Sequence, residues 1–198
     1  MKHEFLKQAE IFAFLAAIFL INVIFLQKQQ QENPPIIILS EKEKSYRFDL
    51  GSAKIPAPFE LALKNRIIPI LDSLSLVYNC DAIEVIGHTD GVPVNSSKSN
   101  LDDSLITSFN QNRVEKLTPG SNVDLGLMRS LAVIQILKQS QKKGNLKKIK
   151  YFFPYSAGQM IKTNKLLMQI DSFEKNKARR RIEIALLKST ARKLETFR

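Results

Sequence analysis

The sequence predicts an α+β fold in which helices pack on one face of a mixed sheet, preceded by a single transmembrane helix near the N-terminus. Three observations carry this prediction. Strand-like and helix-like segments alternate through residues 45–188, and the last two segments are both strand-like, which gives the order β-α-β-α-β-β. An uncharged apolar run at 11–26 stands before them. The 198 residues suffice for one domain with an appendage.

The apolar run at 11–26 is expected to be a transmembrane signal anchor behind a short flank, residues 1–10. It holds fifteen apolar side chains and Asn22. A cleaved signal peptide is the alternative, because Lys2 and Lys7 precede the run, but no site of the Ala-x-Ala kind follows. The run contains no Asp or Glu, so ion translocation through this helix alone gains little support.

Residues 27–44 are expected to form a hydrated linker, because they contain a glutamine run and Pro34-Pro35. The apolar stretch 36–39 within them is a candidate for an early strand. Even fully extended, a linker of this length reaches only about 60 Å. The folded part therefore stays within that distance of the bilayer.

Beyond the linker, each element has its own signal. Residues 46–50 alternate as a short strand, which Gly51 ends. Residues 58–78 carry apolar side chains at helical spacing, and Pro69 must kink or split that helix. Residues 82–87 are β-branched and apolar, as in a buried strand.

The second half of the domain follows the same logic. Residues 122–139 are predicted to form a helix with Asn122 as its cap. Residues 147–153 and 180–187 are predicted to be the last two strands, and 189–198 a basic tail.

The strand at 82–87 ends abruptly in Gly87-His88-Thr89-Asp90. Polar groups that a rigid strand holds at its end are a common way to build a site. His88 could be a metal ligand or a general base, but only His3 accompanies it, so a structural role is favoured. Cys80 is the only cysteine, so an intramolecular disulfide is excluded and a plain structural thiol is expected.

Three motifs in order resemble the OmpA-like peptidoglycan-binding domain, the family that includes peptidoglycan-associated lipoprotein and flagellar motor protein B (MotB). They are GHTD after the second strand, NVDLGLMRSLAV opening the second helix, and RRRIEI in the last strand. The family's helix motif is Asn-x-x-Leu-Ser-x-x-Arg-Ala-x-x-Val. The positions of this motif are filled by Asn122, Leu125, Gly126, Arg129, Ser130 and Val133.

The resemblance implies a non-catalytic module that binds the diaminopimelate residue of the peptidoglycan stem peptide. In that family an Asp and an Arg at the positions of Asp90 and Arg129 hold this zwitterionic group, and a guanidinium can bind a carboxylate through two hydrogen bonds. Thr89, Asn122 and Leu125 are expected to shape the pocket. The alternative for Asp90 and Arg129 is that they only pair with each other.

The chain departs from the family pattern at several positions. Asp90 and Arg129 are separated by an insert, about 95–120. It could be a lid, a partner surface or a neutral surface loop. The neutral loop is favoured, and we expect the insert to be dispensable for folding. Gly126 stands where Ser is usual. Successive strand residues face opposite sides, so only one of Arg180 and Arg181 can face a ligand, and Arg181 is preferred.

The remaining features narrow the function. The net charge is +11, and residues 175–198 hold nine Lys or Arg. Only one aromatic residue, Phe197, lies among them, and a membrane anchor argues against nucleic acid as a partner. No nucleophile motif, metal-ligand cluster or phosphate loop is present, so no catalytic site, metal or cofactor is expected. An enzyme acting on the wall is therefore the third choice.

The leading hypothesis is a single-pass inner-membrane protein whose C-terminal domain binds peptidoglycan in the periplasm. The runner-up is a wall-gripping accessory subunit of a larger envelope machine, such as a motor stator or a secretion complex, with a membrane-protein partner. The uncharged apolar run counts against a stator and leaves other machines open.

Overall fold

The structure is a computed structural model that describes residues 2–29, 33–94, 98–168 and 174–191. The chain divides into two compact units, Met1–Asn33 and Pro34–Arg198. The first unit holds one helix, α1 (Lys2–Gln29), on which apolar side chains from Ile11 to Ile21 are exposed. Among the residues that the structure describes, no helix meets the length and apolarity needed to cross a bilayer.

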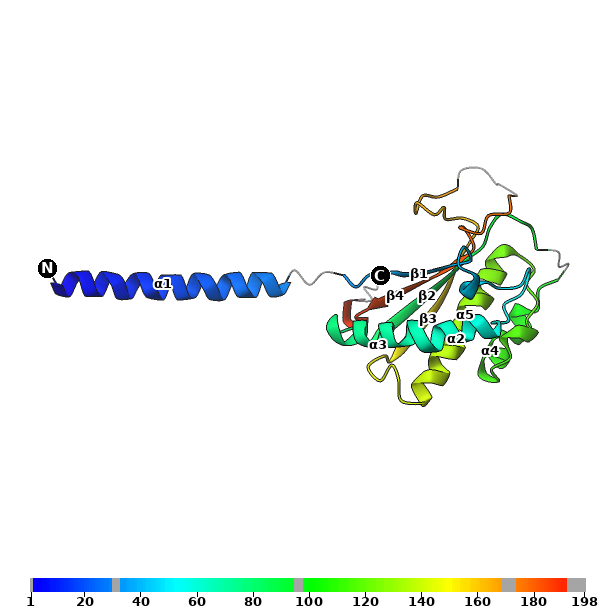
Figure 1. The fold of residues 1–198 in the computed structure, drawn as a ribbon, viewed down its shortest axis with the longest axis horizontal. Coiled ribbons are helices and arrows are strands. Elements are labelled where there is room, and N and C mark those ends of the chain that lie inside the picture. Colours follow the sequence, from blue (N-terminus) through cyan, green and yellow to red (C-terminus); the bar gives the residue numbers. More distant parts are fainter. Residues whose placement is uncertain (1, 30–32, 95–97, 169–173, 192–198) are drawn as a thin grey trace, which may run out of the picture. The chain divides into compact units, whose positions relative to one another are not determined.

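The second unit is built on a mixed sheet of four strands, as predicted (Figure 1). The strands are β1 (Ile37–Ser40), β2 (Ala82–His88), β3 (Tyr151–Gly158) and β4 (Arg181–Leu187). Their spatial order is β1-β4-β2-β3, with β4 antiparallel to both neighbours and β2 parallel to β3. The two parallel strands place their C-terminal ends, His88 and Gly158, at the same edge of the sheet.

The first strand is not where the alternating pattern placed it. β1 coincides with the apolar stretch 36–39, the candidate for an early strand. It lies within the expected linker, so the linker of 27–44 and the domain start at 45 are both corrected. Residues 46–50 form no strand: a 3-10 turn, Lys44–Tyr46, is followed by irregular chain. The alternation arises because Tyr46 and Phe48 both turn inward and pack edge-on against Phe59.

Pro69 splits the first long helix, as expected. The helical stretch runs as α2 (Ala57–Ala62), a π-helical turn (Leu63–Ile67) and α3 (Ile68–Val77). Proline has no N–H to donate to the preceding turn, so it is tolerated within the first turn of α3 but not inside a continuous helix.

The cap of the long helix α5 (Asn122–Lys142) lies one residue earlier than predicted, at Ser121 rather than Asn122. Ser121 Oγ accepts a hydrogen bond from the Asp124 backbone N–H at 3.1 Å, which satisfies one of the free donors of the first turn. Asn122 is thereby released for another contact, described below.

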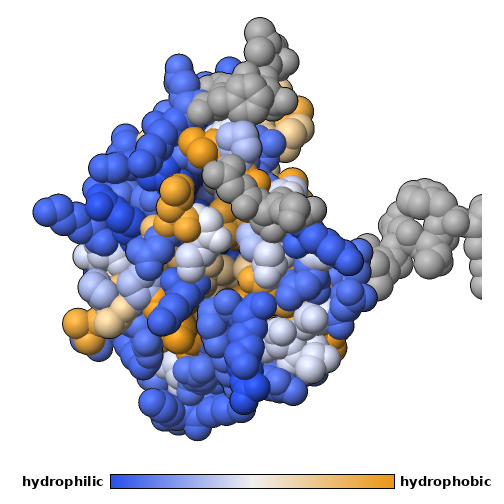
Figure 2. All heavy atoms as spheres, turned by 90° about the vertical axis from the view of Figure 1, so that its right-hand side faces the viewer, coloured by the Kyte–Doolittle hydropathy of each residue, from blue (hydrophilic) through white to orange (hydrophobic). Residues whose placement is uncertain are grey.

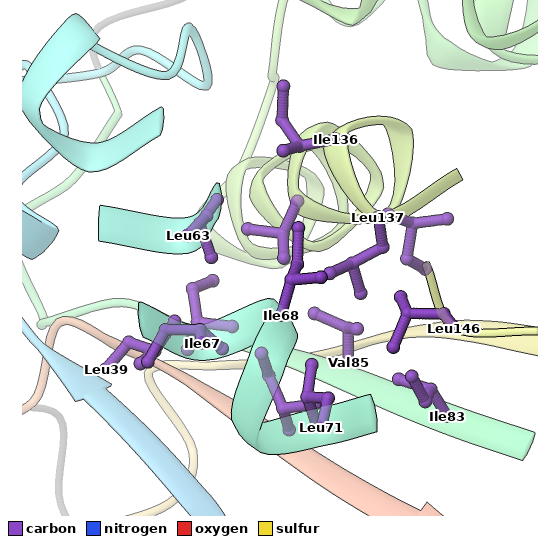
Figure 3. Close-up of a cluster of buried hydrophobic side chains, with 14 of the residues drawn as sticks. Leu39, Leu63, Ile67, Ile68, Leu71, Ile83, Val85, Ile136, Leu137 and Leu146 are labelled. Carbon is purple, nitrogen blue, oxygen red and sulfur yellow. The ribbon is translucent and has the colours of Figure 1, made fainter. Parts of the chain in front are cut away.

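The main core lies between the helices and one face of the sheet (Figure 3). Leu63, Ile67 and Leu71 from the first helical stretch meet Val85 of β2 and Leu137 of α5 there. Because one cluster joins all these elements, the first helical stretch and α5 cover the same face of the sheet, as predicted. Both buried clusters of the described residues lie at or after Leu39, so the unit Pro34–Arg198 carries its own core.

The insert is not a neutral surface loop, and that expectation is wrong. It forms α4 (Leu101–Asn110) and a 3-10 turn (Val114–Lys116). Leu101, Val114 and Leu117 are buried in a second cluster with Met128 and Leu131 of α5. The insert therefore covers the side of α5 that the sheet leaves uncovered. Residues 95–97 of the insert lie outside the described part of the chain.

Figure 2 shows a face on which hydrophilic side chains predominate and hydrophobic ones form small patches between them. Of the expected basic tail, Ser189–Ala191 form a short 3-10 turn, and 192–198 lie outside the described residues.

Candidate functional site

The polar residues that follow β2 are all buried at the edge of the sheet. His88 ends the strand, and Thr89 and Asp90 come directly after it. The Thr89 N–H donates to the Gly158 carbonyl at 2.8 Å, which extends the pairing with β3 by one residue. This bond fixes the backbone immediately before Asp90, so the carboxylate is held in place by the sheet.

Two glycines bring α5 against the same edge. A Cβ atom added to Gly87 would lie 1.9 Å from the Gly126 carbonyl oxygen, and one added to Gly126 would lie 2.3 Å from Ser156 Oγ. Neither distance is sterically possible. The close approach explains why this chain has glycine at position 126, where the resembled family has serine, and it places the first turns of α5 beside Asp90.

A row of alternating buried charges runs along the site. Arg180 Nη1 forms an ion pair with Asp90 Oδ2, which also accepts from the Asn176 N–H at 3.0 Å. Arg180 Nε donates to Glu41 Oε2 at 2.6 Å, and Glu41 Oε1 lies 3.8 Å from Arg129 Nη1. Asp90 and Arg129 thus have different partners, and no hydrogen bond or ion pair of the described residues joins them to each other.

The Arg129 guanidinium is fixed from several directions. Its Nε donates to the Ser52 carbonyl at 3.0 Å and its Nη2 to the Asp49 carbonyl at 3.2 Å. Its Cζ lies 4.7 Å from the centre of the Phe48 ring. Burial lowers the pKa of Arg129 to about 10, although Glu41 opposes the shift, so the side chain is still a cation at neutral pH.

Arg180 keeps its charge more firmly than Arg129. Burial acts to lower its pKa, but the hydrogen bonds and charges of Glu41 and Asp90 outweigh this effect, and the pKa of Arg180 is raised. Two cations and two carboxylates therefore share a small buried region, where each is stabilised mainly by its neighbours.

A pocket of about 360 Å³ is lined by three of these four charged residues, Asp90, Arg129 and Arg180. It contains five of the six residues expected to bind a ligand, and their role in binding stays a prediction. These five residues are Thr89, Asp90, Asn122, Leu125 and Arg129.

Two of these pocket residues, Asn122 and Thr89, differ in the hydrogen bonding of their side chains. Asn122 Nδ2 donates to the Val92 carbonyl at 3.0 Å, which holds the loop after Asp90 against α5. Thr89 Oγ1 is buried and has no hydrogen-bond partner among the described residues. A buried hydroxyl without a partner costs free energy unless something binds it.

The sixth expected residue, Arg181, does not line this pocket; Arg180 does. Arg181 points to the other side of its strand, where Nε donates to Glu183 Oε1 at 2.7 Å and Nη2 donates to the Lys162 carbonyl at 3.3 Å. The preference between the two arginines is thus corrected. The alternation of strand side chains was the right principle, but it could not say which of the two faces held the pocket.

Glu41 is a site residue that the sequence did not single out, whereas Arg180 was considered there but not preferred. Glu41 directly follows β1, and the stretch before it was expected to be linker. The signal that could have found Glu41 is the apolar run 36–39, since a polar residue at the end of a true strand is a site candidate, as Asp90 is.

Comparisons with known proteins were made for the whole chain. No protein-family model and no curated protein matches it. It is similar in structure to the periplasmic domain of Helicobacter pylori MotB, with 19% identity over 80% of this chain and 78% of that chain and a TM-score of 0.48. It is also similar to a MotB-like protein from Desulfovibrio vulgaris, with 13% identity over 77% of this chain and 74% of that chain and a TM-score of 0.44.

Proposed function

We propose that the unit Pro34–Arg198 binds peptidoglycan without catalysis, through the diaminopimelate residue of the stem peptide. The observation that carries the proposal is that one pocket is lined by a fixed carboxylate, Asp90, and a fixed guanidinium, Arg129. The buried hydroxyl of Thr89, which lacks a partner among the described residues, lies beside them. A ligand group with both an ammonium and a carboxylate matches this arrangement.

The roles follow from the contacts of each residue. The hydrogen bond and ion pair described for Asp90 both go to Oδ2, so Oδ1 is the oxygen proposed to accept from the ligand ammonium. Arg129 donates its remaining N–H groups to the ligand carboxylate, since Nε and one Nη2 hydrogen are committed to backbone carbonyls. Thr89 Oγ1 supplies a further hydrogen bond, and Leu125 packs against the aliphatic part of the ligand.

The chemistry of the pocket supports binding rather than hydrolysis. Among the described residues, its lining includes two threonines and one carboxylate but no His, Cys or Ser. A hydroxyl nucleophile needs a base within hydrogen-bond reach, and the contacts described for Asp90 are to Arg180 and Asn176 instead. The charges of the site are thus arranged to hold a ligand in place.

We further propose that residues 11–26 anchor this unit in the inner membrane, with the unit in the periplasm. The support is the uncharged apolar composition of that run within α1. An export-dependent reporter fused after Arg198 should be active, and activity of a cytoplasm-only reporter at the same position would overturn both the topology and the wall-binding role.

The most selective test of the site is Thr89→Val, because this change replaces only the hydroxyl. Since Thr89 Oγ1 has no partner among the described residues, the variant should be as stable as the wild type in urea unfolding. Its affinity for purified peptidoglycan should nevertheless fall about fivefold to tenfold, the value of roughly one neutral hydrogen bond. Thr107→Val, on the exposed surface of α4, is the matched control.

The charged residues provide the stronger test. Asp90→Asn and Arg129→Lys keep the size of each side chain but remove the carboxylate charge or the guanidinium fork, and each should lower wall binding by about 2–5 kcal/mol. Circular dichroism must show that both remain folded. Wild-type affinity in the folded variants would refute the site, as would equal binding to stem peptides whose diaminopimelate carboxylate is amidated.

A further inference from the structure

A second hollow, of about 590 Å³, lies on the side of the unit that the insert builds. It is a groove between α4, α5 and β3. Its walls are mostly apolar, and among the described residues no Asp or Glu lines it. The apolar residues from the two helices are Leu105, Ile106, Phe109, Leu127, Leu131 and Ile134. Ile106 is 71% exposed, so it stands at the mouth of the groove.

The groove is apolar at one end and cationic at the other. Leu127 and Leu131 come from the first half of α5, whereas Lys138 comes from its second half. Lys150, just before β3, lies at the same end as Lys138, because Gln141 Nε2 of α5 donates to the Ile149 carbonyl at 2.6 Å. Lys138 Nζ sits 5.4 Å from the centre of the Phe109 ring. An occupant therefore needs an apolar body and an anionic end.

One wall of the groove is the outer edge of the sheet. Successive side chains of a strand point to opposite faces, yet all five consecutive residues 150–154 line the groove. It must therefore run along the edge of β3. Within the described residues β3 pairs only with β2, so the backbone groups of alternate residues of β3 point away from β2, and those within 150–154 face this groove.

Pro154 indicates which residues of β3 those are. A proline is tolerated in a ladder only where its nitrogen faces away from the neighbouring strand. In a strand, residues two apart point their backbone groups to the same side, so the N–H and C=O of Phe152 also face the groove.

The free strand edge decides among possible occupants. A fatty-acid chain would fit the apolar walls but would bury the backbone groups of Phe152 without hydrogen bonds, which costs about 1–3 kcal/mol for each group. A second copy of this chain would bring two sets of groove lysines together in a protein of net charge +11. An extended peptide satisfies the backbone groups and can supply a carboxylate to the lysines.

We propose that this groove binds an extended, acidic segment of a partner protein, which adds to the sheet as a strand beside β3. Alternate apolar side chains of that segment occupy the hollow between α4 and α5, and an Asp or Glu meets Lys138 and Lys150. The backbone of Phe152 forms the strand pairing. This interface is separate from the wall-binding pocket, since the two share no lining residue.

The proposal can be tested with the compact unit Pro34–Arg198 and a phage-displayed library of random dodecapeptides. We expect the enriched peptides to alternate apolar residues and to carry Asp or Glu near one end. Ile106→Glu, which places a carboxylate at the mouth, and Lys138→Glu should each weaken these peptides by about tenfold or more. Leu76→Glu, at a 65% exposed position on α3, is the matched control and should change nothing.

Hydrogen exchange then distinguishes strand addition from other binding. The Phe152 amide should become protected when an enriched peptide binds. The proposal fails if no peptide is enriched, if Ile106→Glu leaves binding unchanged, or if Phe152 gains no protection. It also fails if hexadecanoate displaces the peptides and binds more tightly than they do, or if sedimentation shows a dimer of the unit that Ile106→Glu abolishes.

Discussion

Glu183 should give this protein a specific loss of stability in acid. Its carboxylate lies behind the pocket on β4, where Oε1 is 3.5 Å from His88 Nε2 and accepts from Arg181 Nε at 2.7 Å. The contact with His88 and the hydrogen bond from Arg181 both lower the pKa of Glu183, whereas burial raises it. The net effect is a fall from the ordinary value of 4.5 to about 2.

The direction and size of the effect follow from this pKa. A carboxyl group whose pKa is lower in the folded state stabilises the fold above its unfolded pKa, and this stabilisation is lost as pH falls through the folded pKa. The window here is from about pH 4.5 down to about pH 2. The fall in pKa corresponds to roughly 3 kcal/mol, at about 1.4 kcal/mol per pH unit.

The measurement is urea unfolding of the unit Pro34–Arg198 at a series of pH values from 7 to 2. Other carboxylates titrate in the same range, so Glu183→Gln is compared with the wild type at each pH. The variant should be less stable at pH 7 by roughly 3 kcal/mol, and the two curves should converge as the pH approaches 2. A constant difference at all pH values would refute the reasoning, because it would show that Glu183 acts through its packing and not through its charge.

Three further predictions concern the packing of the unit. Leu101→Ala should lower the free energy of unfolding in urea by about 2–3 kcal/mol. Ile106→Ala, at an exposed site of the same helix, should lower it by less than about 0.5 kcal/mol. Equal effects would contradict a buried role for the insert. Gly87→Ala should lower the melting temperature strongly or prevent folding, because its Cβ would overlap the Gly126 carbonyl, and a normal thermal transition would show that α5 can move away. Burial raises the pKa of the Cys80 thiol, so Cys80 should react slowly with a disulfide reagent until urea unfolds the protein, and rapid labelling of the folded unit would exclude this burial.

The sequence predicted the elements whose signal is local. The strand before His88 was found because β-branched apolar residues end there in glycine and polar residues. The break at Pro69 was found because proline cannot donate a hydrogen bond. Both signals depend only on neighbours in the chain, and both predictions are confirmed.

The first strand was named only as a candidate within the linker, and residues 46–50 were preferred, because the signal for this strand is not local. Residues 46–50 alternate as well as many strands do, but their inward residues, Tyr46 and Phe48, pack on Phe59 without any strand partner. Residues 37–40 become a strand because the edge of β4 offers them a ladder. Alternation of apolar and polar residues indicates that a segment has one buried face. Whether the segment is a strand depends on a neighbouring strand that can lie far along the chain.

The same distinction explains the site. Asp90 and Arg129 each follow from a motif, but the motifs could not show that Glu41 and Arg180 lie between them. Those two residues are 139 positions apart in the chain and meet at 2.6 Å because β1 and β4 are neighbours in the sheet. Once the strand order is known, the direction in which Arg180 points is also decided. Arg180 precedes β4 beside the end of β1, where Glu41 and Asp90 stabilise its charge. Arg181 pairs with Glu183 instead. The charged row could therefore be derived only from the sheet topology, which no single motif contains.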